Sequence, residues 1–247
     1  MTSSTADLHA AEAHAGPEPG PEPTAVPVPV LGVQDLTMRW PGRPEPVLDG
    51  VSLSVSPGQL VWLGGDNGAG KTTLLRIVAG MVTPESGTVT ICGLDARAHR
   101  RACQRELGFL PAGSSGLYGR LTTSQHLDYW AALALVPRRE RRARAQRALA
   151  AFDLEELAHR RLDRMSMGQR QRVRLAMAVL HEPRLLLLDE PQTSLDTTGL
   201  SLLQRELRVH LAHGGSVLWC SPLAADLGVT QARAHVLVDA RLRAAAW

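Results

Sequence analysis

The pattern of hydrophobic and polar positions changes near residue 30. Residues 1–30 are rich in proline, alanine, glycine and glutamate without sustained periodicity, so we expect a disordered tail. From Val33 onward, short alternating or apolar runs are separated by turn signals such as Pro41-Gly42 and Pro57-Gly58. These runs predict strands at VQDLTM (33–38), VSLSV (51–55) and LVWLG (60–64).

Helical and strand-like segments alternate in the rest of the chain. The apolar spacing predicts helices at TTLLRIVAGM (72–81), VRLAMAVL (173–180) and LSLLQRELRVHLA (200–212), and a helical block from about Leu121 to Arg161. Strands are predicted at SGTVTICG (86–93), LLLL (185–188), SVLWC (216–220) and HVLVDA (235–240). This alternation predicts an α/β fold with a mainly parallel sheet.

A glycine-rich loop lies between the strand LVWLG and the helix that follows it. Gly65–Thr72 matches G-x-x-x-x-G-K-[ST], in which glycines at 65, 68 and 70 let successive N–H groups face phosphates. Lys71 should bridge the β- and γ-phosphates of ATP, and the Thr72 hydroxyl should ligate Mg²⁺. The predicted nucleotide contacts of this loop are Gly65, Asp66, Asn67, Gly68, Ala69, Gly70, Lys71, Thr72 and Thr73.

Lysine usage supports this loop as a phosphate site. The chain holds 27 lysine and arginine residues together, and Lys71 is its single lysine. A compact, flexible ammonium can point between two phosphates, which a planar guanidinium does poorly. Chance placement is the alternative explanation.

Two carboxylates end the apolar run at 185–188. Because ligands of α/β folds bind at the carboxyl ends of strands, Asp189 and Glu190 are placed to act on a nucleotide. Asp189 is predicted to hold Mg²⁺ through water, and Glu190 to polarise the water that attacks the γ-phosphate. Lys71 and Glu190 are therefore the predicted catalytic residues.

The segment before this strand carries a family resemblance. Met165–Arg172 (MSMGQRQR) is similar to the signature LSGGQ followed by QR of ABC cassettes, and the resemblance covers about residues 33–240. It implies that Ser166, Gly168 and Gln169 contact the γ-phosphate held by the other protomer of a cassette dimer. An ordinary serine-capped helix start is the alternative for Ser166.

The same resemblance implies a fold and two more contacts. The fold is the ABC ATPase fold over residues 31–247: a P-loop NTPase core, an N-terminal antiparallel β subdomain and an inserted α-helical subdomain at about 112–172. Thr193–Asp196 resembles the loop that couples the two ATP sites, with Asp196 as a nucleotide contact. Trp40 occupies the place of the aromatic residue that stacks on adenine, although a plain surface tryptophan is the alternative.

Two positions depart from the family pattern. Ala112 stands where these cassettes usually have the glutamine that contacts Mg²⁺ and the attacking water, and Pro222 stands where they usually have a histidine on the γ-phosphate. Alanine has no polar side-chain atom, and proline offers neither a side-chain donor nor an N–H. Both changes therefore predict slow hydrolysis at this chain's own site.

Composition and charge limit the other function classes. No run of about 18 apolar residues occurs, so a membrane role needs a partner, and we expect a cytoplasmic subunit on the inner face of the cell membrane. A net charge of +3 spread along the chain predicts no nucleic-acid partner.

The arginine-rich run at 138–147 is read as a solvated helix face, with an acidic-lipid or nucleic-acid contact as the alternative. The dispersed cysteines, Cys92, Cys103 and Cys220, argue against a metal site or a disulfide framework.

The resemblance implies an integral membrane permease and a second cassette, identical or different, as partners. The segment GLYGRLTTSQHL (116–127) resembles the corresponding segment of exporter cassettes and favours export. Two alternatives stay open: a regulatory cassette that binds ATP with little turnover, and a soluble ABC ATPase acting on ribosomes or DNA. Neither a second cassette nor a long coiled-coil insertion is visible in the sequence, which disfavours the soluble class.

Overall fold

The computed structural model describes residues 28–114, 116–222 and 232–245, so most of the predicted tail, residues 1–27, lies outside it. The strands are β1 (Leu31–Met38), β2 (Leu48–Val55), β3 (Leu60–Gly64), β4 (Ser86–Ile91), β5 (Leu94–Asp95), β6 (Leu107–Leu110), β7 (Leu185–Asp189), β8 (Ser216–Cys220), β9 (Ala232–Val238) and β10 (Arg241–Ala245). The α-helices are α1 (Lys71–Val78), α2 (Arg100–Arg105), α3 (Thr123–Leu133), α4 (Arg138–Ala151), α5 (Met167–Val179) and α6 (Thr197–Ala212).

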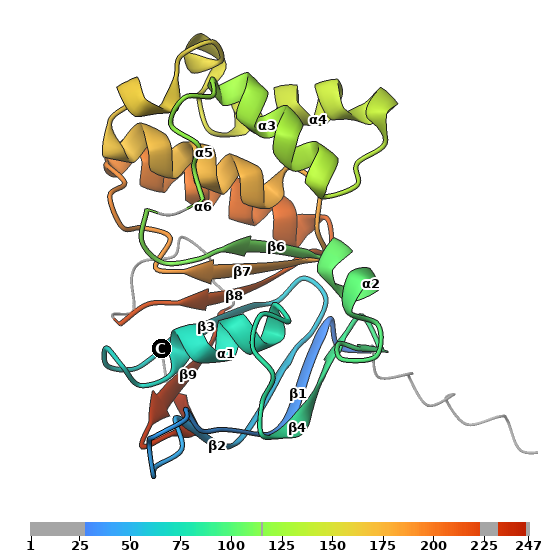
Figure 1. Ribbon diagram of the computed structural model, residues 1–247, viewed down its shortest axis with the longest axis vertical. Helices are drawn as coiled ribbons and strands as arrows, with labels where there is room; N and C mark the ends of the chain where they lie inside the picture. Colours follow the sequence, from blue (N-terminus) through green and yellow to red (C-terminus); the bar gives the residue numbers. More distant parts are fainter. Residues whose placement is uncertain (1–27, 115, 223–231, 246–247) are drawn as a thin grey trace, which may run out of the picture.

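The strands form two sheets (Figure 1). The larger has the order β10-β9-β3-β8-β7-β6, in which all neighbours pair in parallel except the antiparallel hairpin β9–β10. The smaller sheet, β2-β1-β4-β5, is antiparallel. The predicted α/β class with a mainly parallel sheet is confirmed.

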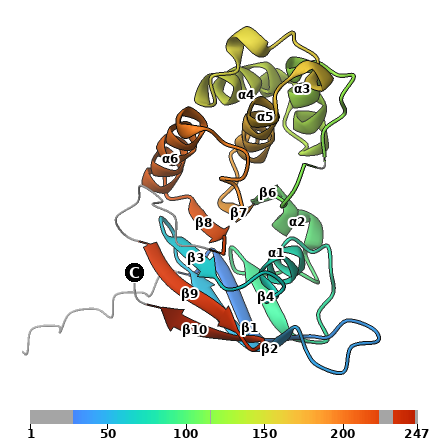
Figure 2. The same ribbon diagram turned by 90° about the vertical axis from the view of Figure 1, so that its left-hand side faces the viewer.

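Alternate side chains of the larger sheet belong to different cores. On β7, Leu185 and Leu187 pack in the core that contains α1 and the smaller sheet. Leu186 and Leu188 pack in the core that contains α3, α4, α5 and α6. Because both faces are covered, every residue of β3, β7 and β8 is buried, as expected of a parallel sheet between two layers. Figure 2 shows α5 and α6 on one side of the sheet and α1 on the other.

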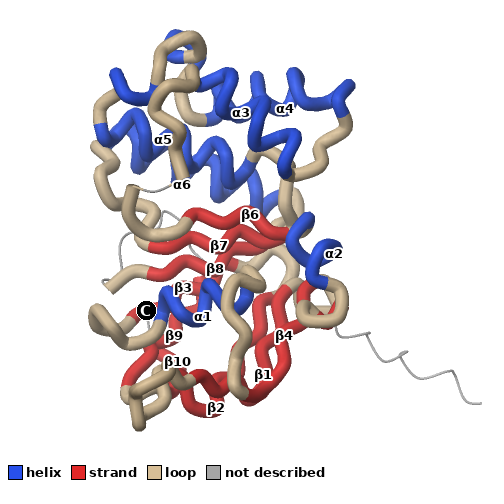
Figure 3. The backbone as a smooth tube through the Cα atoms, viewed as in Figure 1, coloured by secondary structure: helices blue, strands red, loops and turns tan. Residues whose placement is uncertain are grey.

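The helical block of the prediction lies between β6 and the end of α5, and Figure 3 shows its helices gathered at one end of the molecule. Within the arginine-rich run, Arg144 pairs with Glu140 and Glu182, and Arg147 also pairs with Glu182. Part of the run is therefore engaged within the protein. None of the described helices is both long and apolar enough to cross a membrane.

Several predicted boundaries differ from the structure: the strand predicted at 86–93 ends at Ile91, and the helices predicted from 173 and 200 begin at 167 and 197. Two further boundaries are wrong for a reason that the backbone shows. The helix predicted to reach Met81 ends at Val78, and Gly80 follows in the left-handed conformation (φ 69°) typical of a glycine that stops a helix. The strand predicted at 235–240 ends at Val238, because Asp239 and Ala240 both have positive φ and form the two-residue turn into β10. Helix α2 and strands β5, β6 and β10 were not predicted.

Candidate nucleotide-binding site

Four strands of the larger sheet end side by side at one edge, and each leads into a candidate residue. In sheet order they are β3, β8, β7 and β6. Their carboxyl ends lead to the phosphate loop, Pro222, Asp189 with Glu190, and Ala112, respectively. Segments from four distant parts of the sequence therefore meet where a parallel α/β sheet binds its ligand.

The conformation of the phosphate loop requires its glycines. Gly65, Gly68 and Gly70 have φ values of 129°, 86° and 108°, a region that L side chains rarely adopt. A Cβ at Gly65 would lie 2.5 Å from the Leu237 carbonyl oxygen, and one at Gly70 would lie 2.7 Å from the Val47 carbonyl oxygen. Sterics thus fix the curled backbone that exposes N–H groups at the start of α1.

The Lys71 side chain spans this loop. Its Nζ donates hydrogen bonds to the Gly65 carbonyl at 2.5 Å and the Asp66 carbonyl at 2.8 Å, and the residue is 6% exposed. The Ala69 N–H also donates to the Asp66 carbonyl, at 3.1 Å. The ammonium group is therefore held by two backbone oxygens of the loop itself.

Thr72 and Asp189 meet although 117 positions separate them. The Thr72 hydroxyl donates to Asp189 Oδ2 at 2.8 Å, and Asp189 is 2% exposed. Burial raises the pKa of Asp189, whereas the Thr72 hydrogen bond, backbone hydrogen bonding at Ala112 and the charge of Lys71 lower it. A hydroxyl and a buried carboxylate are hard oxygen ligands of the kind Mg²⁺ prefers, so the residues fit the predicted metal.

Trp40 and Glu190 line the same cavity as the phosphate loop. Its volume is about 300 Å³, and its lining residues are Trp40, Arg43, Val47, Asn67, Gly68, Gly70, Lys71, Thr72, Thr73 and Glu190. Arg43 was not predicted; its position three residues after Trp40 in a Pro-Gly turn is the signal that could have indicated it.

Glu190 has an uncommon backbone conformation. Its φ is 50°, and its N–H donates to the Cys220 carbonyl on β8 at 2.8 Å. A non-glycine residue in this region costs free energy and persists where surrounding contacts fix it. The bond to β8 therefore helps to aim the carboxylate at the cavity that Lys71 and Thr72 also line.

The signature residues lie elsewhere. Ser166 caps α5: its Oγ accepts from the Gln169 N–H at 3.2 Å, and its own N–H donates to Gln169 Oε1 at 3.0 Å. A Cβ at Gly168 would lie 3.0 Å from the Ser194 carbonyl oxygen, and Asp196 caps α6 through the Gly199 N–H at 2.7 Å. These residues are absent from the lining of the cavity beside the phosphate loop. The capping alternative for Ser166 describes its role within this chain.

Comparison with known proteins decides the family. The family model described as ABC transporter matches residues 48–193, more than half of the chain. This chain belongs to the ABC transporter family. Its expected ABC ATPase fold is confirmed, and the cassette is an ABC-type ATPase.

Its relatives include proteins named for import and for export. The cassette is 33% identical to the ABC transporter ATP-binding protein NatA of Bacillus subtilis over 80% of its own length and 81% of NatA. It is 40% identical to the Fe(3+) ions import ATP-binding protein FbpC of Escherichia coli over 66% of its length but only 45% of FbpC. It is 38% identical to the cytochrome c biogenesis ATP-binding export protein CcmA of Methylococcus capsulatus over 73% and 86% of the two chains.

Solved cassette structures share the fold. An ATP-binding subunit of an ABC transporter superimposes with a TM-score of 0.79 and 28% identity, over 86% of this chain and 88% of that one. The cassette MJ0796 is described as dimeric in a post-hydrolysis state with ADP and Pi. It superimposes with a TM-score of 0.73 and 25% identity, over 87% of this chain and 97% of that one.

Proposed function

We propose that this cassette binds and hydrolyses ATP to drive transport by a separate membrane subunit, in the direction of export. The observation that carries the proposal is that Trp40, Lys71, Thr72 and Glu190 line one and the same cavity. Asp189 joins them through the hydrogen bond that it accepts from Thr72. Lys71 and the loop N–H groups bind the phosphates, Trp40 stacks on adenine, and Glu190 takes the proton of the attacking water. Thr72 and Asp189 hold Mg²⁺, which supplies positive charge to the phosphates when bound.

A second cassette completes the site in this proposal. Ser166 is exposed at the N-terminus of α5, with Gly168 and Gln169 in its first turn, and these residues do not line their own chain's cavity. A helix N-terminus is a favourable place for phosphate, so an ATP bound to the other protomer is a suitable ligand. Asp196 lies in the loop that follows Glu190 and is positioned at the same interface. The partner is an identical or a different cassette.

Hydrolysis at this cassette's own site is weakened under the proposal. Ala112 and Pro222 are both exposed at the edge where the strands end, and neither brings a polar side chain to the γ-phosphate. Loss of one preorganised polar contact in a transition state costs about a factor of 10² in rate. These two positions also support the second candidate function, a regulatory cassette that closes on ATP with little turnover.

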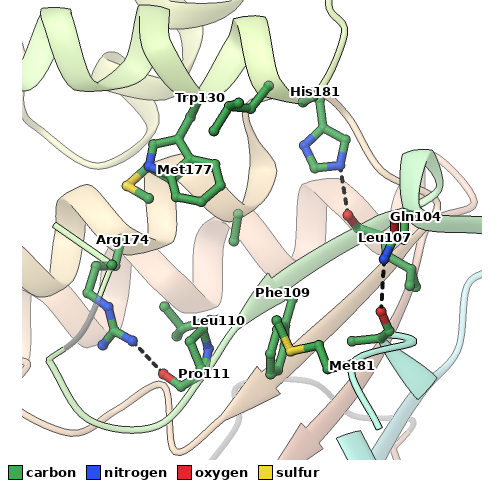
Figure 4. Close-up of a pocket in the computed structure, with 15 residues that line it drawn as sticks. Met81, Gln104, Leu107, Phe109, Leu110, Pro111, Trp130, Arg174, Met177 and His181 are labelled. Carbon is green, nitrogen blue, oxygen red and sulfur yellow. Dashed lines mark hydrogen bonds between the residues drawn. The ribbon is translucent and has the colours of Figure 1, made fainter. Parts of the chain in front are cut away.

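An apolar groove is the proposed contact for the membrane subunit. A cavity of about 350 Å³ lies where α3 and α5 face β6, and Pro111 and Arg174 line it (Figure 4). Met81 and Leu133 also line it and are 61% and 52% exposed. Because Pro111 precedes Ala112, a segment docked here would touch the loop beside Asp189. We assign the groove to a cytoplasmic segment of the permease, and this puts the cassette on the inner face of the cell membrane.

The domain organisation belongs to the same proposal. One ABC ATPase domain covers residues 31–247. The helical subdomain at about 112–172 carries the signature and contributes part of the groove lining, with Trp130 and Leu133 among it. Export is supported by the exporter-like segment at 116–127 and by the similarity to a protein named for export, while FbpC is named for import.

ATPase measurements on the purified transporter test the hydrolytic proposal. Glu190→Gln should remove only a minor part of the steady-state rate if a different partner cassette supplies the faster site, and the partner's matching variant should remove most of it. If the partner is an identical chain, the whole rate should be slow and should depend on Glu190. A fast rate that depends wholly on Glu190 would contradict a weakened site, and tight ATP binding without turnover would favour the regulatory cassette.

Surface variants test the membrane contact. Leu133→Glu at the groove should release the cassette from its membrane subunit while ATP binding stays unchanged, because a buried unpaired charge opposes docking. Val209→Glu is the matched control, since Val209 is 46% exposed on α6 outside the groove lining. Equal membrane recovery of the two variants would show that the permease contacts another face.

A further inference from the structure

Arg174 is a buried arginine in the middle of α5 with three partners. It is 5% exposed, and its guanidinium donates to the Pro111 carbonyl at 2.5 Å, to the Gly113 carbonyl and to Gln171 Oε1 at 2.7 Å. Figure 4 shows the guanidinium pointing at Pro111. A buried cation is costly unless its donors are satisfied, so these partners fix the position of the side chain.

Gln171 extends the network to a second loop. It lies one turn before Arg174 on the same face of α5, and its Nε2 donates to the Pro191 carbonyl at 3.0 Å. Gln171 is 6% exposed, so water does not compete strongly for its amide. A continuous path of hydrogen bonds therefore runs from the loop after β6, through Arg174 and Gln171, to the loop after β7.

Both ends of this path lie beside the reacting groups. Pro111 and Gly113 flank Ala112, whose backbone lowers the pKa of the Asp189 carboxyl. Pro191 directly follows Glu190, and the Thr193 N–H of the same loop donates to the Glu190 carbonyl at 3.1 Å. Displacement of either loop would therefore move a carboxylate that acts on the nucleotide.

We propose that Arg174 and Gln171 are positioning residues that lock the two loops to the signature helix, so that Asp189 and Glu190 are aligned together. In this cassette the side chain at position 112 is a methyl group, so the link between the groove and the nucleotide runs through the backbone that Arg174 holds. Arg174 also lines the groove, and a partner seated there acts on both loops at once. This inference rests on the proposed ATPase function for its kinetic consequence but not for the physical link itself.

Hydrogen–deuterium exchange of the full chain tests the link without turnover. Arg174→Met keeps length and removes the donors, so amides 112–114 and 192–194 should both exchange about tenfold faster. Gln171→Leu should raise exchange at both loops as well. Arg144→Met is the matched control, because Arg144 is also largely buried and donates to a backbone carbonyl, that of His181, at 2.6 Å. Faster exchange at 112–114 alone in Arg174→Met would overturn the link between the loops.

Kinetics of the assembled transporter test the positioning role. Both variants should lower kcat by about ten- to a hundredfold with KM for ATP changed less than about twofold, because misplaced groups lose rate rather than ground-state binding. The double variant should be no slower than Arg174→Met, since the two residues act as one unit. Arg144→Met provides the comparison for stability. If it lowers both Tm and kcat as much as Arg174→Met does, Arg174 has only a structural role. A wild-type transporter without turnover would refute the hydrolytic proposal, and the exchange result would still decide the link.

Discussion

Replacement of Ala112 by glutamine should accelerate hydrolysis at this cassette's own site. Ala112 is exposed, so a longer side chain does not collide with the core. Its backbone lowers the pKa of Asp189, and Asp189 Oδ2 lies 2.8 Å from the Thr72 hydroxyl. A glutamine at this position therefore starts within one side-chain length of the predicted Mg²⁺ ligands.

The expected gain follows from the contact that is restored. One preorganised polar group at a transferring phosphoryl is worth about 10² in kcat, which corresponds to about 2.7 kcal/mol of activation free energy. Because the new side chain lies on an exposed loop and loses rotamer freedom when it makes the contact, part of that free energy is offset. We expect Ala112→Gln to raise kcat by about tenfold.

Single-turnover hydrolysis of bound ATP is the appropriate assay, because it reports chemistry at this site separately from product release. In a complex with a different cassette, the partner's catalytic carboxylate is replaced so that only this site turns over. Ala112→Met is the control, since methionine has similar length and no amide. If the glutamine and methionine variants hydrolyse at the same rate, the polar contact is not what this site lacks.

Three further results are expected. Trp40→Ala should weaken ATP binding by about 1–3 kcal/mol, roughly 5- to 150-fold, in a fluorescence titration, because base stacking is lost. When the pH is lowered, the affinity for Mg²⁺ should begin to fall at a higher pH than it would with an ordinary aspartate. Burial raises the pKa of Asp189, and its proton competes with the metal. Tm should fall as pH drops below about 6.5, because burial lowers the pKa of His126 and the unfolded chain takes up the proton first. His126 Nε2 accepts from the Tyr118 N–H at 3.0 Å, and protonation breaks that bond.

Each of these results has a matched control. Trp40→Phe should retain most of the ATP affinity, and equal losses in the alanine and phenylalanine variants would exclude stacking. Asp189→Asn should bind Mg²⁺ more weakly, and its Mg²⁺ affinity should depend less on pH. If the pH dependence is unchanged, the titrating group belongs to the nucleotide and not to Asp189. His126→Gln offers the same acceptor without a titrating group, so its Tm should depend less on pH. An identical pH profile would assign the loss to other histidines.

Local patterns predicted most of the fold because β3, β7 and β8 are continuous apolar runs and helices such as α1 and α6 keep an apolar period. The elements that were missed are short or depend on distant contacts. Strand β6 has only four residues and is stabilised by pairing with β7, which lies 75 or more positions later. Helix α2 has six residues and buries only Cys103, so its sequence carries almost no apolar period.

The residues of the candidate site likewise differ in how well the sequence predicts them. The phosphate loop could be predicted because its glycines and Lys71 are close together in the sequence. The contact of Trp40 with the same cavity, which the structure provides, was predicted only through a family resemblance. Arg174 could not be singled out among the arginines, because nothing local distinguishes a buried guanidinium from a solvated one. Two of its three partners are backbone carbonyls about 60 positions away, which side-chain patterns do not encode.

The two backbone bonds of Lys71 change how substitutions of this lysine should be interpreted. The ammonium closes the loop through its hydrogen bonds to the Gly65 and Asp66 carbonyls. An ammonium has three N–H donors, so two are engaged by backbone carbonyls and one is left for a phosphate oxygen. Removal of the amine would also release the loop that the amine had been holding. A lower ATP affinity in a Lys71 variant would therefore combine a lost phosphate contact with a loop that is no longer held in place.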